Sequence, residues 1–203
     1  MAKENKVSKN MAHAQKYDLI PFEDYLAGER DVEIRSEYVD GLVYAMAGAS
    51  ETHNTIAGSF FAQIEINLKD GCRVWQSDMK VVIRNKGQKF SYYPDTMAAC
   101  GENTDDLYVR TNPILIVEVL SDSTERTDLK EKFDNYISIP TLLEYVVVSQ
   151  DVPLVRLWRR RTSWEREMYR ADDTFRLESV ELDVPVQHIY RRVRKEVGLD
   201  VSR

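Results

Sequence analysis

The clearest hydrophobic pattern in the chain is an apolar run at residues 113–120, Pro-Ile-Leu-Ile-Val-Glu-Val-Leu. A short run without polar alternation is typical of a strand that is buried on both faces of a sheet. Residues 33–46 instead alternate around the pair Asp40-Gly41, which fits the two-residue turn of a β-hairpin. Both patterns indicate a fold that is built around β-sheet.

The remaining patterns predict several helices and further strands. Apolar residues at helical spacing predict helices at 20–26, 52–68, 125–137 and 185–193. Strands are predicted at 72–76, 79–84, 92–99, 114–120 and 144–149, and an antiparallel meander at 154–160, 164–170 and 174–177. We expect one α+β domain at residues 17–196, preceded by a disordered tail at 1–16 and followed by a tail at 197–203.

Composition restricts the class of protein. A chain of 203 residues with 43% hydrophobic content can bury one substantial core. Its apolar runs are much shorter than a membrane span and its start lacks the apolar centre of a secretory signal, so we expect a soluble, cytoplasmic protein without a membrane partner. Cys72 and Cys100 are too far apart in sequence for a short metal-binding motif and are expected to be reduced thiols.

The charge pattern leaves two interpretations open. A net charge of −6 opposes avid non-specific binding to nucleic acid. Basic residues nevertheless cluster at 156–170 and 191–195. These clusters indicate either solvated faces of a hairpin and of the last helix, or a surface that contacts phosphates.

The candidate chemistry begins with an acid inside the buried strand. Glu118 interrupts the apolar run, and a buried carboxylate is costly unless it is paired or holds a metal. Asp95 lies in another strand-like stretch, after Pro94. Two acids on neighbouring strands form a minimal site for a hard cation such as Mg²⁺ or Mn²⁺. A buried arginine beside Glu118, or an ordinary turn at Asp95, would be the structural alternatives.

The helix predicted at 125–137 adds a cation. Asp128 and Lys132 are four residues apart and share a helical face with Tyr136. That face borders the apolar stripe, so Lys132 is expected to point towards the sheet, where it could stabilise a phosphoryl group or an attacking water. An ordinary surface ion pair between Asp128 and Lys132 is the alternative.

Over roughly residues 20–193 the sequence resembles a known family, the Uma-two family ("putative restriction endonuclease"). The similar segments are Tyr93-Pro94-Asp95, residues 116–124, Asp128 with Lys132-Phe133 and Tyr136, residues 139–151, Trp164, residues 177–180 and Ile189-Tyr190. The stretch Glu-Val-Leu-Ser-Asp-Ser-Thr at 118–124 is the most specific of these.

The resemblance implies a PD-(D/E)XK nuclease fold, a restriction-endonuclease-like mixed β-sheet flanked by helices. It implies that Asp95 and Glu118 hold a divalent metal together with the backbone carbonyl of Val119. The lysine of the superfamily would fall at position 120, where this chain has Leu120, and Lys132 is its natural substitute. Glu37 and His53 match family-like positions, while Asp78 is a supporting acid or a turn residue.

Three functions follow as hypotheses. The first is a Mg²⁺- or Mn²⁺-dependent endonuclease that hydrolyses DNA, acting as a homodimer so that both strands are cut. The second is a nucleic-acid-binding or assembly module that does not cleave, as the missing lysine at position 120 and the net negative charge suggest. The third is a hydrolase for a small phosphate ester, which would need a closed pocket.

Overall fold

The computed structural model describes residues 18–102, 106–120 and 127–199, with only the backbone given at 127 and 128. The expected N-terminal tail at 1–16 therefore lies outside the described residues. The helices are α1 (Phe22–Gly28), α2 (Glu51–Asn67), the π-helix η1 (Thr127–Lys132), α3 (Phe133–Tyr136), the 3₁₀ turns η2 (Arg160–Thr162) and η3 (Glu178–Val180), and α4 (Val186–Ile189). Among these residues no helix is both long and apolar enough to cross a bilayer.

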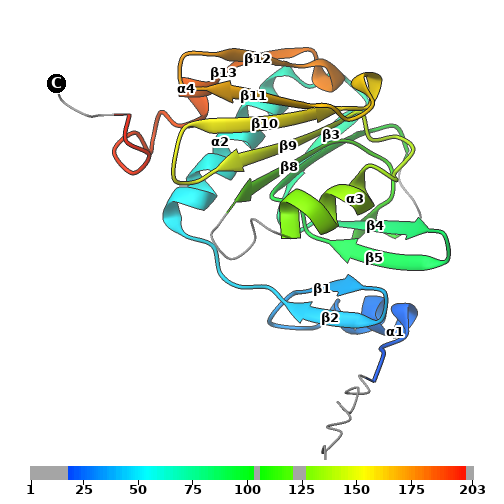
Figure 1. Ribbon diagram of the computed structural model, residues 1–203. Helices are drawn as coiled ribbons and strands as arrows, with labels where there is room; N and C mark the ends of the chain where they lie inside the picture. Colours follow the sequence, from blue (N-terminus) through cyan, green and yellow to red (C-terminus); the bar gives the residue numbers. More distant parts are fainter. Residues whose placement is uncertain (1–17, 103–105, 121–126, 200–203) are drawn as a thin grey trace, which may run out of the picture.

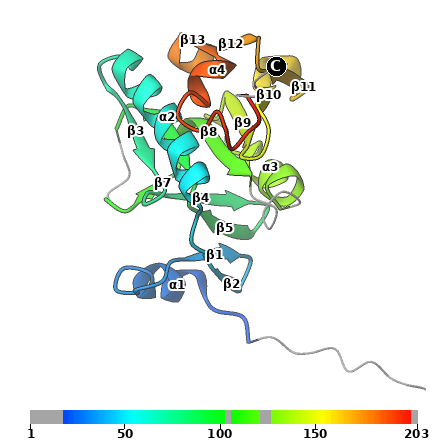
Figure 2. The ribbon, with the colours of Figure 1, turned by 90° about the vertical axis from the view of Figure 1, so that its left-hand side faces the viewer.

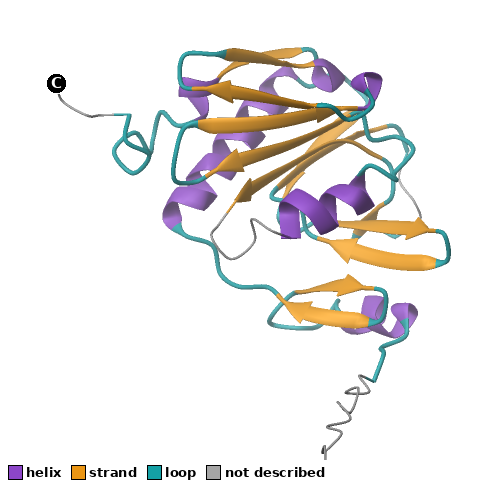
Figure 3. Ribbon diagram, in the orientation of Figure 1, coloured by secondary structure: helices purple, strands orange, loops and turns teal. Residues whose placement is uncertain are grey.

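The strands form three sheets, shown in Figures 1 and 3. The central six-stranded sheet has the order β11 (Arg166–Arg170), β10 (Leu154–Arg159), β9 (Glu144–Ser149), β8 (Pro113–Leu120), β6 (Thr96–Cys100), β3 (Cys72–Gln76). The five-stranded sheet has the order β2 (Leu42–Ala45), β1 (Ser36–Val39), β5 (Gln88–Tyr92), β4 (Lys80–Asn85), β7 (Val109–Arg110). Strands β12 (Thr174–Leu177) and β13 (Leu182–Pro185) form a third, two-stranded sheet.

The sheets are mixed, because β8 pairs parallel with β9 and β4 pairs parallel with β7, whereas the other pairs are antiparallel. Helices α2 and α3 lie on opposite sides of the six-stranded sheet, as Figure 2 shows. This arrangement confirms the expected α+β class with a mixed sheet flanked by helices.

The two faces of β8 belong to different cores. Leu115, Val117 and Val119 pack in the cluster that contains α2, whereas Ile116 and Leu120 pack in the cluster that contains Tyr136 of α3. Since successive side chains of a strand point to opposite faces, Glu118 points to the α3 side together with Ile116 and Leu120. The apolar run therefore has two buried faces, as predicted, and one of them carries a carboxylate.

Several predicted elements are wrong in detail. The strand expected at 92–99 is two strands of different sheets, β5 and β6, separated at Tyr93-Pro94-Asp95. Proline has no N–H to donate to a ladder, which favours a break there. The third strand of the expected meander, β12, pairs with β13 rather than β11. The helix expected at 185–193 is shorter and ends at Ile189. Val197, which was expected to lie in the C-terminal tail, is buried in the core.

The cysteines also differ from the expectation of reduced thiols. Cys72 and Cys100 lie directly opposite each other in the β3–β6 pair and are joined by a disulfide, with their Cα atoms 3.9 Å apart. The two positions are 28 residues apart in sequence, and only the register of β3 against β6 brings them together. That register could not be read from the sequence.

Candidate metal and phosphodiester site

Asp95 lies at the crossing from one sheet to the next. It immediately precedes β6, whose first residue, Thr96, pairs with Val117 of β8. One carboxylate oxygen, Oδ2, accepts a hydrogen bond from the backbone N–H of Val119 at 2.7 Å, and the other, Oδ1, lies 2.9 Å from His53 Nε2. These contacts fix the carboxylate against β8 on one side and α2 on the other.

Glu118 is almost completely buried beside Asp95, at 3% exposure. Its Oε2 accepts a hydrogen bond from the backbone N–H of Asp95 at 3.3 Å, and its Oε1 accepts one from the hydroxyl of Tyr136 at 2.8 Å. Burial, and secondarily the negative charge of Glu118, raises the pKa of Tyr136 well above its ordinary value, so the hydroxyl stays protonated and can donate.

Lys132 supplies positive charge to this carboxylate. It is the last residue of η1 and is 7% exposed. Its Nζ lies 3.5 Å from Glu118 Oε1 and 2.8 Å from Glu37 Oε1 of β1, and 5.5 Å from the centre of the Tyr92 ring. An ammonium held by two carboxylates and an aromatic face is firmly positioned at the edge of the acid pair.

His53 reaches Asp95 because the start of α2 is anchored. Ser50 caps the helix by accepting a hydrogen bond from the backbone N–H of His53 at 3.1 Å. The Ser50 hydroxyl in turn donates to Gln150 Oε1, just after β9, at 3.0 Å. The first turn of α2 is therefore tied to the end of the central sheet, and His53 is held beside Asp95.

These side chains line one open cleft of about 810 Å³. Its charged lining residues are Glu33, Arg35, Glu37, Asp95, Glu118 and Lys132, with His53 beside them. Four carboxylates and two cationic groups leave a net charge of −2 when His53 is neutral. An excess of negative charge in a cleft favours a divalent cation.

The donor set fits a hard cation. Asp95 and Glu118 contribute carboxylate oxygens, and Mg²⁺ is commonly bound by one or two carboxylates while it keeps several waters or substrate oxygens. Among the described residues no group of three or more His, Cys, Asp and Glu side chains forms a complete cage. A metal here would therefore need further ligands, such as the backbone carbonyl of Val119 and substrate oxygens.

The structure brings most of the expected site residues together. Six of them line the cleft: Asp95, Glu118, Val119, Lys132, Glu37 and His53. The hydroxyl of Tyr136 donates to Glu118. Asp78 is exposed and does not line the cleft, but it forms an ion pair with Arg35, which does. The side chain of Asp128 is outside the described residues.

Some contributors were not found by sequence reasoning. Ser50, Gln150 and Tyr92 support His53 and Lys132, although none was named as a site residue. Ser50 directly precedes the helix and matches an N-cap preference, which was the available signal. Gln150 and Tyr92 become neighbours only through tertiary structure.

The basic cluster at 156–170 is partly structural. Arg159 is buried against Glu144 and Glu167. The Arg160 side chain donates to backbone carbonyls that include Leu142, and Arg161 forms two hydrogen bonds with Glu178. At least these three arginines are engaged by carboxylates or carbonyls of the protein itself, and they do not form one continuous phosphate-binding face.

Comparisons with known proteins agree with this architecture. The model of the Uma-two family (Uma2), described as "Putative restriction endonuclease", matches residues 22–187. Uncharacterized protein slr1290 of Synechocystis sp. is 34% identical over 173 residues, which are 83% of this chain and 90% of that protein. Uncharacterized protein sll1609 of the same organism is 34% identical over 131 residues, 63% of this chain and 73% of that protein.

A solved structure shares the fold. The crystal structure described as a putative nuclease belonging to DUF820, from Anabaena variabilis, superposes with a TM-score of 0.71 at 15% identity. The superposition covers 85% of this chain and 98% of that one. With the family match across residues 22–187, these findings show that the chain belongs to the Uma-two family.

Proposed function

We propose that the protein is a divalent-metal-dependent endonuclease that hydrolyses phosphodiester bonds of DNA. The observation that carries the proposal is the contact between two acids in an open cleft, Asp95 and Glu118, with Lys132 at their edge. Membership of a family described as "Putative restriction endonuclease" supports the same reaction class.

Each side chain has a distinct role in this proposal. Asp95, Glu118 and the carbonyl of Val119 would hold Mg²⁺ or Mn²⁺, which when bound supplies an activated water and neutralises charge on the phosphate. His53 positions Asp95 through Oδ1. Lys132 takes the place of the lysine absent at Leu120, and its Nζ would donate to a phosphate oxygen or to the attacking water.

The position of Lys132 also favours a second candidate, a DNA-binding module that does not cleave. Its ammonium is already bound by Glu37 at 2.8 Å, and a lysine retained there would not reach substrate. In this case DNA would bind in a salt-dependent manner without turnover.

Nicking of supercoiled plasmid in EDTA, Mg²⁺ or Mn²⁺ separates the two candidates. Wild type should nick only with metal, and Asp95→Asn and Lys132→Ala should each lower the rate by at least about a hundredfold, as expected when a group that stabilises transition-state charge is lost. Asp183→Asn, which removes an exposed carboxylate on β13 whose partner is Arg176, outside the cleft, is the matched control and should keep wild-type activity. Nicking that is equal in wild type and Asp95→Asn would refute the assignment.

We also propose a cytoplasmic location, because DNA is the substrate; the Cys72–Cys100 disulfide, a bond that is rare in the reducing cytoplasm, is the observation against it. Cleavage of both strands supports a homodimer with two-fold related clefts. Sedimentation equilibrium of the purified protein with and without duplex DNA would show whether one chain or two are present.

A further inference from the structure

A second crevice lies at the far end of β6 from Asp95. It has a volume of about 560 Å³ and lies between β3, the edge of the six-stranded sheet, and β7, the edge of the five-stranded sheet. Its lining residues are Gly71, Cys72, Arg73, Gly101, Glu102 and Arg110. Two of these six are arginines, and the nuclease chemistry above uses neither.

Arg110 is an unusual residue to find buried. Its side chain is 5% exposed, and its guanidinium carbon lies 4.2 Å from the centre of the Trp75 ring, so the planar group stacks on an aromatic face. Its Nε and Nη1 are buried and make no hydrogen bond within the part of the chain that the structure describes. Buried donors without acceptors are costly, so an acceptor that reached this guanidinium would stabilise it.

Arg73 adds a second positive charge. Arg73 and Trp75 are alternate residues of β3 and therefore point to the same face, which is the face that Arg110 covers. Burial, and secondarily the charge of Arg73, lowers the pKa of Arg110. Across the described residues Arg73 forms no ion pair, and Glu102, the one carboxylate in the lining, is paired with neither arginine. The lining keeps a net charge of +1.

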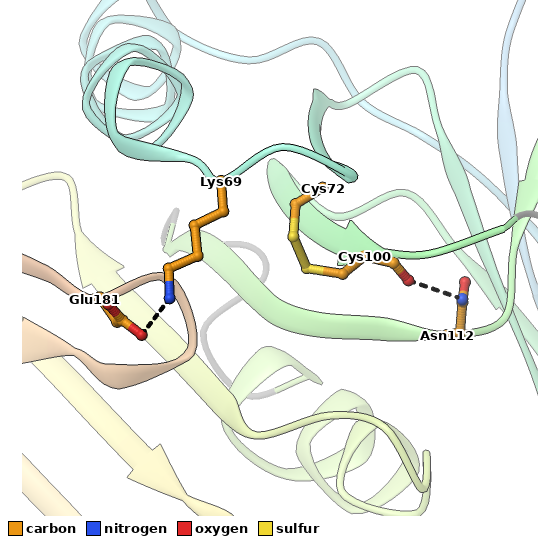
Figure 4. The surroundings of a disulfide bond; sticks show 5 residues. All are labelled: Lys69, Cys72, Cys100, Asn112 and Glu181. Carbon is orange, nitrogen blue, oxygen red and sulfur yellow. Dashed lines mark hydrogen bonds and ion pairs between the residues drawn. A yellow bond between two sulfur atoms is a disulfide. The ribbon is translucent and has the colours of Figure 1, made fainter.

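A disulfide and several hydrogen bonds join the walls of the crevice, and Figure 4 shows the disulfide and the Cys100–Asn112 hydrogen bond. The disulfide joins Cys72 to Cys100, and the backbone N–H of Gly101 donates to the carbonyl of Gly71 at 2.9 Å. The Asn112 side-chain amide donates to the carbonyls of Cys100 at 3.5 Å and Glu102 at 3.3 Å. A crevice whose walls are already held loses little freedom when a ligand enters, which favours binding.

We propose that this crevice is an oxyanion site for a phosphate group, bound by Arg110 and Arg73. Guanidinium groups match phosphate geometry with paired, charge-assisted hydrogen bonds, which Arg73 and Arg110 could both donate from the wall of the crevice. A phosphate dianion would also remove the repulsion between the two arginines. The phosphate group is that of a free anion or of a DNA backbone, and the site does not depend on the cleavage chemistry.

The first probe is inorganic phosphate in EDTA. Its binding is measured by calorimetry and by the NMR signal of the Arg110 Nε–H group. Wild type should bind phosphate and shift that signal, and Arg110→Gln and Arg73→Gln should each weaken binding at least about tenfold, as expected for loss of charge-assisted hydrogen bonds. Arg166→Gln is the matched control, since Arg166 is exposed on β11 at the opposite edge of the sheet. Arg73 is exposed, so its variant tests the proposal even if Arg110→Gln does not fold.

A duplex of DNA in EDTA is the second probe, and it distinguishes the source of the phosphate. Loss of phosphate binding in both variants supports a free-anion site. Loss of duplex affinity in both variants, without measurable phosphate binding, supports a backbone phosphate. Phosphate and duplex binding that are unchanged in both variants, or absent in wild type, would overturn the proposal. None of these readouts requires cleavage, so a failure here is distinct from a failure of the nuclease assignment.

Discussion

Replacement of Lys132 by methionine should destabilise the metal-free protein and increase its response to metal. Methionine keeps much of the side-chain volume but removes the ammonium that lies 2.8 Å from Glu37 and 3.5 Å from Glu118. The side chains of Lys132 and Glu118 are 8% and 4% exposed, so water cannot replace the lost charge around Glu118. Glu37, at 17%, remains partly hydrated.

The structure sets the expected size of this effect. Breaking a buried ion pair by removal of one partner costs about 3–5 kcal/mol. Glu118 keeps the Tyr136 hydroxyl and Glu37 is partly hydrated, so we expect a loss at the lower end, about 3 kcal/mol. For a domain of this size that corresponds to a fall in Tm of about 6–12 °C. Loss of the Lys132 ammonium also leaves the acids of the cleft with one more net negative charge, which should strengthen Mg²⁺ binding.

Thermal unfolding in EDTA and in Mg²⁺ measures both effects. Lys132→Met should unfold earlier than wild type in EDTA, and Mg²⁺ should raise its Tm more than that of wild type. Lys130→Met is the matched control, because Lys130 lies on the same π-helix but is exposed. The reasoning is refuted if the two variants are equally stable in EDTA and respond equally to Mg²⁺.

Three further predictions concern the supporting structure. Tyr136→Phe removes only the hydroxyl that donates to Glu118 and should lower the free energy of unfolding, measured in urea, by about 1.5–3 kcal/mol. The control Tyr44→Phe, at an exposed tyrosine, should leave stability unchanged, and equal stability of the two variants would contradict the prediction. The double variant Cys72→Ser, Cys100→Ser should have a free energy of unfolding about 2–4 kcal/mol lower than that of wild type. Thiol titration of the denatured, unreduced wild type should find no free thiol, and two free thiols would exclude the disulfide. Burial raises the pKa of several tyrosines, so their contribution to stability is complete below the ordinary pKa of 10.0 and is lost as pH rises beyond it. Absorbance at alkaline pH should show these buried tyrosines ionising only with unfolding, as a separate step; a single reversible step that accounts for all eleven tyrosines in the folded protein near pH 10 would contradict it. The tyrosines concerned are Tyr25, Tyr92, Tyr93 and Tyr190.

Local signals in the sequence were sufficient for parts of the fold. The hairpin at Asp40-Gly41 was predictable because both residues adopt positive φ, 45° and 103°, which this pair tolerates. The strand 113–120 was predictable because an apolar run of that length has to be buried on both faces. The carboxylate of Glu118 within that run was the strongest indication of chemistry, since its burial requires partners.

Long-range pairing was not predictable from the same signals. Pro94 indicates a break in the stretch 92–99, but nothing there shows that Tyr92 and residues 96–99 belong to different sheets. The disulfide depends on the register of β3 against β6, and strand register is not encoded in a short segment. The proximity of Arg73 to Arg110 likewise arises only where the edges of two sheets meet.

For Lys132, one contact could be predicted from the sequence and another could not. Helical spacing indicated that it shares a face with Tyr136, and in the structure both side chains contact Glu118. Its second partner, Glu37, comes from a hairpin almost a hundred residues earlier, and spacing along one helix cannot reveal such a contact. The helix itself is a π-helix followed by one α-helical turn, and hydrophobic period alone does not distinguish the two.

Calorimetric titration of Mn²⁺ into the purified protein is the most direct test of the site, with Asp95→Asn, Glu118→Gln and the control Asp183→Asn titrated in parallel. Wild type and Asp183→Asn should bind the ion alike, and loss of either Asp95 or Glu118 should weaken binding at least about tenfold, because each supplies a charged ligand. Equal binding by all four proteins would contradict a metal site between Asp95 and Glu118.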